Sequence, residues 1–158
     1  MANPTYTPVT GTVQGITTLS ASCCDQLLTL ATTNGVVTFV ISSDTYITNN
    51  IQLRRGMRAT VFYDAKLPVP LIFPPRYQAE VVAVVSRNET AVLQYFDRNL
   101  LAADGSLQLN LGPTTAITSA NGQLFSCNPG GNLLLVYYGA TTRSIPPQAT
   151  PHRILVFC

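Results

Sequence analysis

The chain has 158 residues, of which only 10% are charged, and its formal net charge at pH 7 is +2. Average globular proteins carry about 25% charged residues, so the polar surface must come from Thr, Ser, Asn and Gln. No apolar run approaches the roughly 18 residues of a membrane-spanning helix. The basic cluster Arg54, Arg55 and Arg58 is too short for a nucleic-acid-binding stripe. Membrane insertion is therefore excluded, and a nucleic-acid partner is disfavoured.

Residues 1–10 predict an extended N-terminal arm. The segment has neither the basic start nor the apolar core of a signal peptide. A segment rich in Pro and Thr is most easily ordered by lying along a partner. The candidate assembly arm consists of Asn3, Pro4, Thr5, Tyr6, Thr7 and Pro8.

Beyond the arm, apolar and polar residues alternate and no helical periodicity is present, which predicts β-strands. The clearest case is the second-half segment 107–111, in which Leu alternates with Gln and Asn. Turn signals such as Asn34-Gly35 and Asp104-Gly105 separate the strands. Strands are expected near residues 10–18, 26–32, 36–42, 58–64 and 79–85, and again near 91–96, 99–103, 106–111, 133–138 and 153–157.

The second half of the chain repeats features of the first half in the same order. Each half has a strand followed by a Thr-rich segment, then a Gly and a strand that ends in two aromatic residues, then Pro-Pro and an apolar run. Order kept over several elements indicates an internal repeat. We therefore predict an all-β chain with two similar five-stranded units, residues 11–85 and 91–158, packed together. Five twisted strands favour a small barrel of the oligonucleotide/oligosaccharide-binding (OB) type, and a single β-sandwich is the alternative.

Two segments of the sequence resemble parts of a known β module. Ser43-Asp44-Thr45-Tyr46-Ile47, with residues 53–63, resembles a small OB-like β module found in proteins of spore-forming, Gram-positive bacteria. Residues 141–151 are similar to the closing segment of that module. The sequence departs from the module at Gly131-Asn132 and at Pro70-Leu71-Ile72. The resemblance implies a fold and a bacterial source, and it implies no chemistry, cofactor or catalytic residue.

No constellation typical of an enzyme is present. His152 is the only histidine, and the seven carboxylates show no paired motif. A zinc site of Cys23, Cys24, Cys127 and His152 can be written down, but adjacent residues of an extended chain point to opposite sides. A Cys127 nucleophile with His152 as its base lacks a third group to orient it. We expect no enzyme, no cofactor and no metal.

The cysteines favour covalent links between subunits. Cys23 and Cys24 are adjacent, so each is expected to find a different partner, and Cys158 can reach outward. These three residues are the candidates for intersubunit disulfides, whereas Cys127 is expected to be buried or to form a disulfide. Four reduced cysteines in a cytosolic protein remain the alternative.

The leading hypothesis is a structural subunit that assembles with copies of itself into a bacterial extracellular fibre or spore-surface layer, through strand addition by the arm and disulfide links. The Cys-Cys pair and the low charge resemble those of endospore appendage subunits. The expected location is the cell or spore surface, with the cytoplasm as the alternative. The second hypothesis is an OB-like binding module for a sugar, a peptide or single-stranded nucleic acid. Its groove would be lined by members of the set Tyr46, Phe62, Tyr63, Tyr77, Tyr137 and Tyr138.

Overall fold

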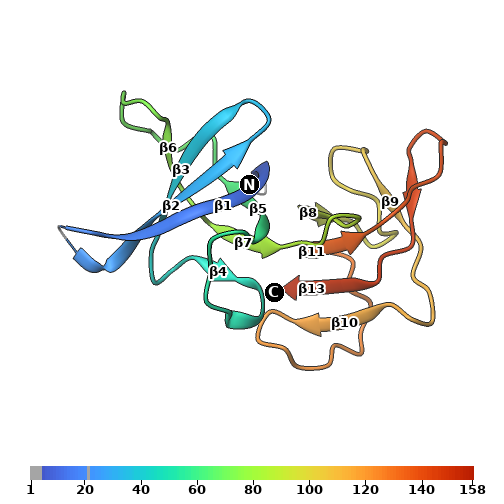
Figure 1. Ribbon diagram of the computed structural model, residues 1–158. Helices are drawn as coiled ribbons and strands as arrows, with labels where there is room; N and C mark the ends of the chain where they lie inside the picture. Colours follow the sequence, from blue (N-terminus) through green and yellow to red (C-terminus); the bar gives the residue numbers. More distant parts are fainter. Residues whose placement is uncertain (1–4, 21) are drawn as a thin grey trace. The chain divides into compact units, whose positions relative to one another are not determined.

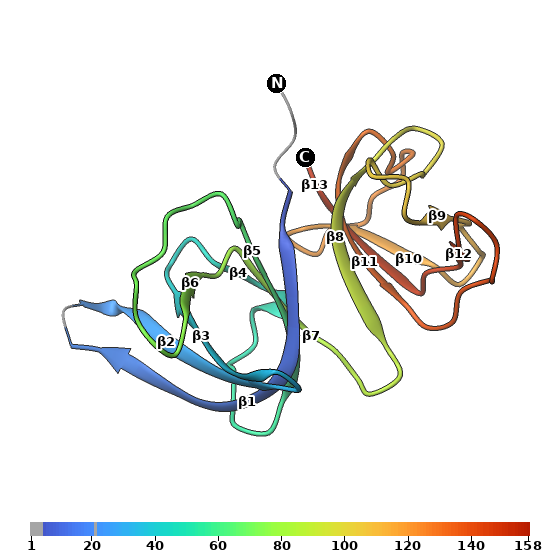
Figure 2. The same cartoon turned by 90° about the horizontal axis from the view of Figure 1, so that it is seen from above.

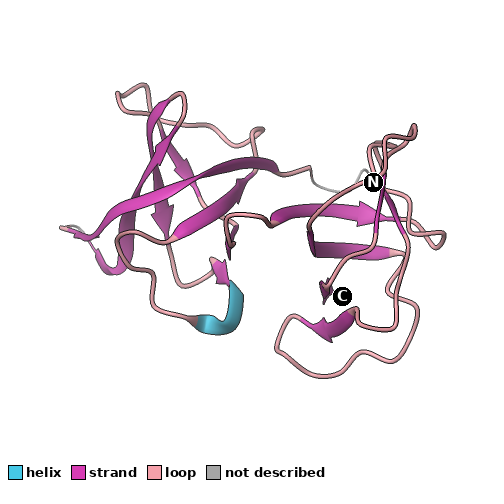
Figure 3. Ribbon diagram, turned by 45° about the vertical axis from the view of Figure 1, so that its right-hand side comes forward, coloured by secondary structure: helices cyan, strands magenta, loops and turns pink. Residues whose placement is uncertain are grey.

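The computed structural model describes residues 5–20 and 22–158, whose regular secondary structure is almost entirely β-strand (Figures 1 and 3). The only helix of the described residues is a single 3-10 turn, Thr48–Asn50. The all-β class is therefore confirmed. Among the described residues, no helix is long and apolar enough to cross a membrane. Two compact units divide the chain between Arg87 and Asn88, within the polar stretch at residues 86–90.

The first unit is one sheet with the strand order β4-β7-β5-β1-β2-β3-β6. The pairs β4–β7 and β3–β6 are parallel, and all the others are antiparallel. Its strands are β1 (Thr7–Leu19), β2 (Ser22–Thr32), β3 (Gly35–Ile41), β4 (Tyr46–Ile47), β5 (Arg58–Tyr63), β6 (Arg76–Gln78) and β7 (Val81–Val84).

The second unit contains a four-stranded sheet, β10-β13-β11-β8, and the two-stranded sheet β12-β9. The pairs β10–β13 and β9–β12 are parallel, and the other two are antiparallel. Its strands are β8 (Thr90–Phe96), β9 (Gln108–Leu109), β10 (Ala116–Ser119), β11 (Asn132–Tyr138), β12 (Gln148–Ala149) and β13 (Arg153–Phe157).

The two units share part of their pattern of strand pairing. The series β4-β7-β5-β1 and β10-β13-β11-β8 each begin with a parallel pair and continue with two antiparallel pairs. After each Pro-Pro, a proline carbonyl accepts a hydrogen bond from the neighbouring strand: Thr38 N donates to Pro75 O at 2.9 Å, and Gln108 N donates to Pro147 O at 3.0 Å. The units differ at the position of β2. The first unit has a full strand there, whereas the second unit has only isolated bridges, such as that between Phe96 and Ala102.

Several expectations need correction. The first unit has seven strands and the second has six, instead of five each. Residues 99–103 form isolated bridges and no strand. The four additional strands, β4, β6, β10 and β12, are two to four residues long, too short for an alternating pattern to predict. Strand pairing also closes no barrel within the described residues, because β4 and β6, the end strands of the first sheet, are not paired with each other.

The predicted arm is shorter than residues 1–10. β1 begins at Thr7, and Thr7 and Pro8 lie opposite Tyr63 and Phe62 of β5 in the same chain. The apolar side chain of Val9 packs against the core of the first unit. This contact favours strand pairing of this part of the segment over a free arm. Only the residues before Thr7 can therefore form an arm.

Each unit has its own hydrophobic core, built from the alternating apolar residues of its longer strands. Val13, Leu28, Leu30, Phe39 and Val61 have at most 1% of their surface exposed in the first unit. In the second unit the corresponding set includes Phe96, Leu134, Val136, Ile154 and Val156. Burial of one such side chain contributes about 1.5–3 kcal/mol, so each core can hold its sheet in register.

Two glycines of β1 give a test of this packing. A Cβ atom on Gly11 would lie 2.2 Å from the carbonyl oxygen of Ala31, whereas one on Gly15 would meet no atom within 4 Å. Gly11→Ala is expected to lower the free energy of unfolding by roughly 1–3 kcal/mol. Gly15→Ala should leave it unchanged or raise it by up to about 1 kcal/mol, because alanine restricts the unfolded chain. Urea unfolding followed by circular dichroism measures both, and equal effects would contradict the β1–β2 register.

Candidate functional site

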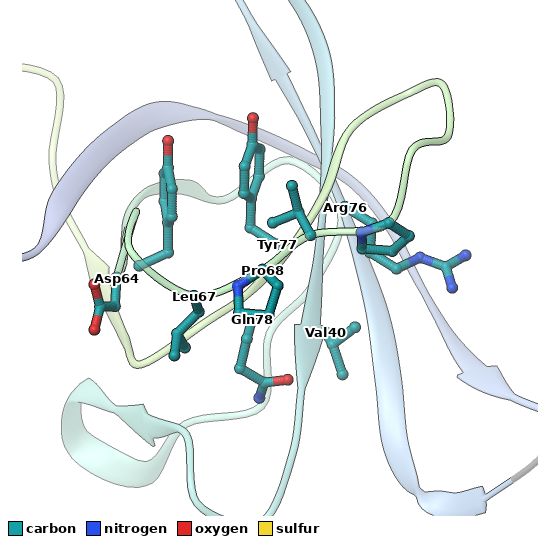
Figure 4. A pocket seen from close by; sticks show the side chains of 10 residues that line it. Val40, Asp64, Leu67, Pro68, Arg76, Tyr77 and Gln78 are labelled. Atoms are coloured by element: carbon teal, nitrogen blue, oxygen red, sulfur yellow. The ribbon is translucent and has the colours of Figure 1, made fainter.

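A cavity of about 160 Å³ lies in the first unit beside the loop that joins β5 to β6, residues 64–75. Its walls are the loop residues 67–70, the β6 residues 76–78, and Val40, Tyr63 and Asp64 (Figure 4). The loop is Pro-rich and apolar, so it forms one wall without needing strand pairing. Because its lining is mostly apolar and aromatic, the cavity is a candidate binding site of this unit.

Two tyrosine rings form the aromatic part of this cavity. Tyr63 ends β5 and Tyr77 lies in β6, and their ring centroids are 4.3 Å apart with 26° between the planes. The ring centroids of Tyr63 and Tyr77 lie 6.1 and 6.0 Å from the ring centroid of the buried Phe39. Burial raises the pKa of the Tyr63 hydroxyl, and the adjacent Tyr77 raises it further. Part of the effect of Tyr77 on this pKa is a side-chain hydrogen bond between the two tyrosines.

The polar groups stand on opposite sides of the aromatic pair. Figure 4 shows Asp64 to one side of Tyr77 and the guanidinium group of Arg76 to the other. One carboxylate oxygen of Asp64 accepts the backbone N–H of Lys66 at 2.9 Å. The Nε of Arg76 is buried and has no hydrogen-bond partner within the described part of the chain. An unpaired buried donor costs about 1–3 kcal/mol.

Of the six aromatic candidates for a groove, the structure brings together Tyr63 and Tyr77. Phe62 and Tyr137 are buried, with 1% and 2% of their surface exposed. Tyr138 packs against the core of the second unit, and burial raises its pKa. Alternation along β5 separates Phe62 from Tyr63, because adjacent residues of a strand face opposite sides.

All four cysteine thiols are free and exposed. Cys23 and Cys24 lie in β2 close to the turn after β1, where the β1–β2 ribbon extends past the end of β3 (Figures 1 and 2). The expectation that Cys127 is buried is wrong, because the residue lies in the exposed loop between β10 and β11. Solvent can therefore reach every thiol.

The remaining sequence candidates do not converge on a chemical site. The Nε2 of His152 pairs with a carboxylate oxygen of Glu89. No group of three His, Cys, Asp or Glu side chains that could hold a metal is found among the described residues. In the candidate arm, Asn3 and Pro4 lie outside the described residues, and Thr5 is exposed. Burial raises the pKa of Tyr6, and Glu80 and Asp64 raise it further, so Tyr6 lies against its own unit.

Sequence reasoning missed the exposed apolar side chains of the loops. Leu71 and Phe73 of the β5–β6 loop are 102% and 94% exposed, Leu124 is 92% exposed, and Ile145 is 100% exposed. The sequence did contain a signal for two of these exposed side chains. A large apolar residue precedes Pro-Pro in both halves of the chain, at Phe73 and at Ile145. No protein-family model, no curated protein and no solved structure matches this chain, so its own surface chemistry carries the functional argument.

The exposure of the cysteines predicts a simple titration. Freshly reduced, folded protein should react with an aromatic disulfide reagent at four thiols per chain, at rates close to those of the urea-unfolded protein, because all four are exposed. Cys127→Ser should change the free energy of unfolding by less than about 0.5 kcal/mol, as exposed positions usually do. One thiol that reacts only after unfolding would contradict the position of the corresponding cysteine.

Proposed function

We propose that this chain is a structural subunit that assembles with copies of itself into a bacterial extracellular fibre or spore-surface layer. The observation that carries the proposal is the exposure of all four thiols on a β-scaffold. In oxidising surroundings two thiols from neighbouring copies join as a disulfide, and two electrons and two protons pass to an oxidant such as dioxygen. Low charge supports the proposal, because like-charged copies repel each other less.

We further propose that the two units are copies of one OB-like module. In the first unit the strands β7-β5-β1-β2-β3 follow one another in the sheet, which agrees with the Greek-key order of a partly open five-stranded OB-fold. The matched pairings of β13, β11 and β8 support a common origin for the second unit. A repeated scaffold suits a structural subunit, because each copy presents its loops on similar supports.

The assembly mechanism that we propose combines strand addition with these disulfides. The donating segment is the part of the chain before β1, because Thr7 and Pro8 already pair with β5. Added strands bind through backbone hydrogen bonds and therefore tolerate a plain Thr-rich sequence. Cys127 joins Cys23, Cys24 and Cys158 as a candidate for the covalent links, because it is exposed like the others.

A binding module is the second candidate, and the tyrosine cavity favours it. Aromatic faces beside the Asp64 carboxylate and the Arg76 guanidinium group can hold a small polar ligand such as a sugar or a short peptide. This function would leave the four thiols without a role. The two candidates therefore differ in what oxidation does to the protein.

Electrophoresis under denaturing conditions distinguishes them. Protein oxidised by air should give a ladder of covalent oligomers without reductant, and a thiol reductant should collapse it to one band. Replacing all four cysteines by Ser should abolish the ladder, and the double variant Cys23→Ser, Cys24→Ser should shorten it. A single monomer band from oxidised wild-type protein would overturn covalent assembly and favour the binding module.

The strand-addition step has its own test. Deletion of residues 1–5 leaves Tyr6 and β1 intact, so the circular dichroism spectrum should stay that of the wild type, while filaments or layers should disappear in negative-stain electron microscopy. A matched variant in which residues 1–5 become Gly and Ser residues should still assemble, because backbone pairing does not depend on those side chains. Normal assembly by the deletion variant would rule out the arm as the donor.

A further inference from the structure

Two equivalent loops of the chain each present a large apolar side chain to solvent. Phe73 precedes Pro74-Pro75 in the β5–β6 loop, and Ile145 precedes Pro146-Pro147 in the β11–β12 loop, residues 139–147. Their side chains are 94% and 100% exposed. The hydrogen bonds to the Pro75 and Pro147 carbonyls place the two positions alike in their units. Single exposed apolar residues are common, but recurrence at one position in loops of different length and sequence indicates a shared use.

The cavity beside Tyr77 is large enough for such a side chain. Its volume is about 160 Å³, and an apolar cavity of about 150 Å³ accepts a group as large as benzene. Val40, Leu67 and Pro68 supply apolar wall, and the stacked tyrosines supply an aromatic face. An isoleucine side chain fits both the size and the chemistry of this site.

Charge selects Ile145 over Phe73 as the inserted side chain. Arg143 is exposed and stands two residues before Ile145, a distance of roughly 7 Å along an extended chain. The cavity has the carboxylate of Asp64 at one side and the guanidinium group of Arg76 turned away at the other (Figure 4). Phe73 has no charged residue within two positions of it. The Ile145 loop therefore brings a cation that can pair with the Asp64 carboxylate, on the side of the cavity away from the Arg76 guanidinium group.

We propose that Ile145 of one copy inserts into the Tyr63–Tyr77 cavity of the next copy, with Arg143 paired to Asp64. This inference rests on the proposed self-assembly and names its non-covalent contact. The inserted residue belongs to the second unit and the cavity belongs to the first, so the two surfaces of the contact differ. Such a head-to-tail contact repeats from copy to copy and gives a filament or a ring.

The contact is small and is expected to be reversible by itself. One loop inserted into one cavity buries far less than the roughly 1,200 Å² of a stable protein–protein interface. It positions neighbouring copies, and the added strand and the disulfides then raise the overall affinity through multivalency. The contact should therefore be measured in reduced protein, where no covalent link hides it.

Sedimentation velocity of reduced protein over a range of concentrations tests the proposal. Ile145→Ser should weaken self-association about tenfold or more, as the loss of one buried aliphatic side chain predicts. Leu124→Ser is the matched control, because Leu124 is also an exposed apolar loop residue of the second unit, at 92%. It should associate like the wild type, and both variants should keep the wild-type circular dichroism spectrum.

A charge exchange tests the predicted pairing directly. Arg143→Asp and Asp64→Arg should each weaken the association, and the two changes together should restore it, because opposite charges again face each other. No recovery in the double variant, or equal behaviour of Ile145→Ser and Leu124→Ser, would overturn the contact. Ile145-dependent binding of monomers to phosphatidylcholine vesicles in place of self-association would also overturn it.

These outcomes are separable from those of the proposed function. A wild-type disulfide ladder together with an unaffected Ile145→Ser variant would reject this contact and leave covalent assembly standing. Wild-type protein that neither forms a ladder nor associates when reduced would reject both.

Discussion

The position of the tyrosine cavity depends on one carbonyl group. Pro75 O accepts the backbone N–H of Thr38 at 2.9 Å and its hydroxyl at 2.8 Å, and Thr38 is 6% exposed. These two bonds fix the start of β6 against β3 in the parallel direction. Tyr77 follows two residues later and is thereby brought onto Tyr63 of β5. Within the described residues, the apolar loop before the prolines has no such backbone bonds to a strand, and it stands out from the unit (Figure 1).

The sequence was sufficient to predict the long strands. β1, β2, β3, β5, β7, β8, β11 and β13 all overlap the strands expected from alternation, because a longer strand with one buried face imposes period two on its sequence. The short strands β4, β6, β10 and β12 leave no such trace, whereas β9 lies in the alternating segment 107–111. β12 contains two residues and is defined by backbone pairing with β9, which is compatible with almost any side chain. The seven strands of the first sheet therefore exceeded the five expected.

The candidate site was predicted only in part. Tyr63 and Tyr77 were expected in a groove, but they lie 14 positions apart and meet through tertiary packing that no local pattern encodes. Cys127 was expected to be buried because it is apolar and was assigned to a repeat. Its neighbours Ser126, Asn128 and Pro129 are typical of a loop, and that signal was the more informative one. The exposure of Ile145 was missed because an apolar residue beside two prolines suggests a core position as readily as a loop tip.

Cys23 and Cys24 are adjacent in β2, at an irregularity of its pairing with β1, and both are exposed. With Cys127 and Cys158, one chain carries four exposed thiols. In polymer chemistry a monomer with two reactive groups can make only threads or rings, whereas a monomer with more than two makes branches and crosses a gel point. Complete oxidation of this subunit would therefore give an insoluble network, and a thread requires that some of its thiols stay reduced or are capped.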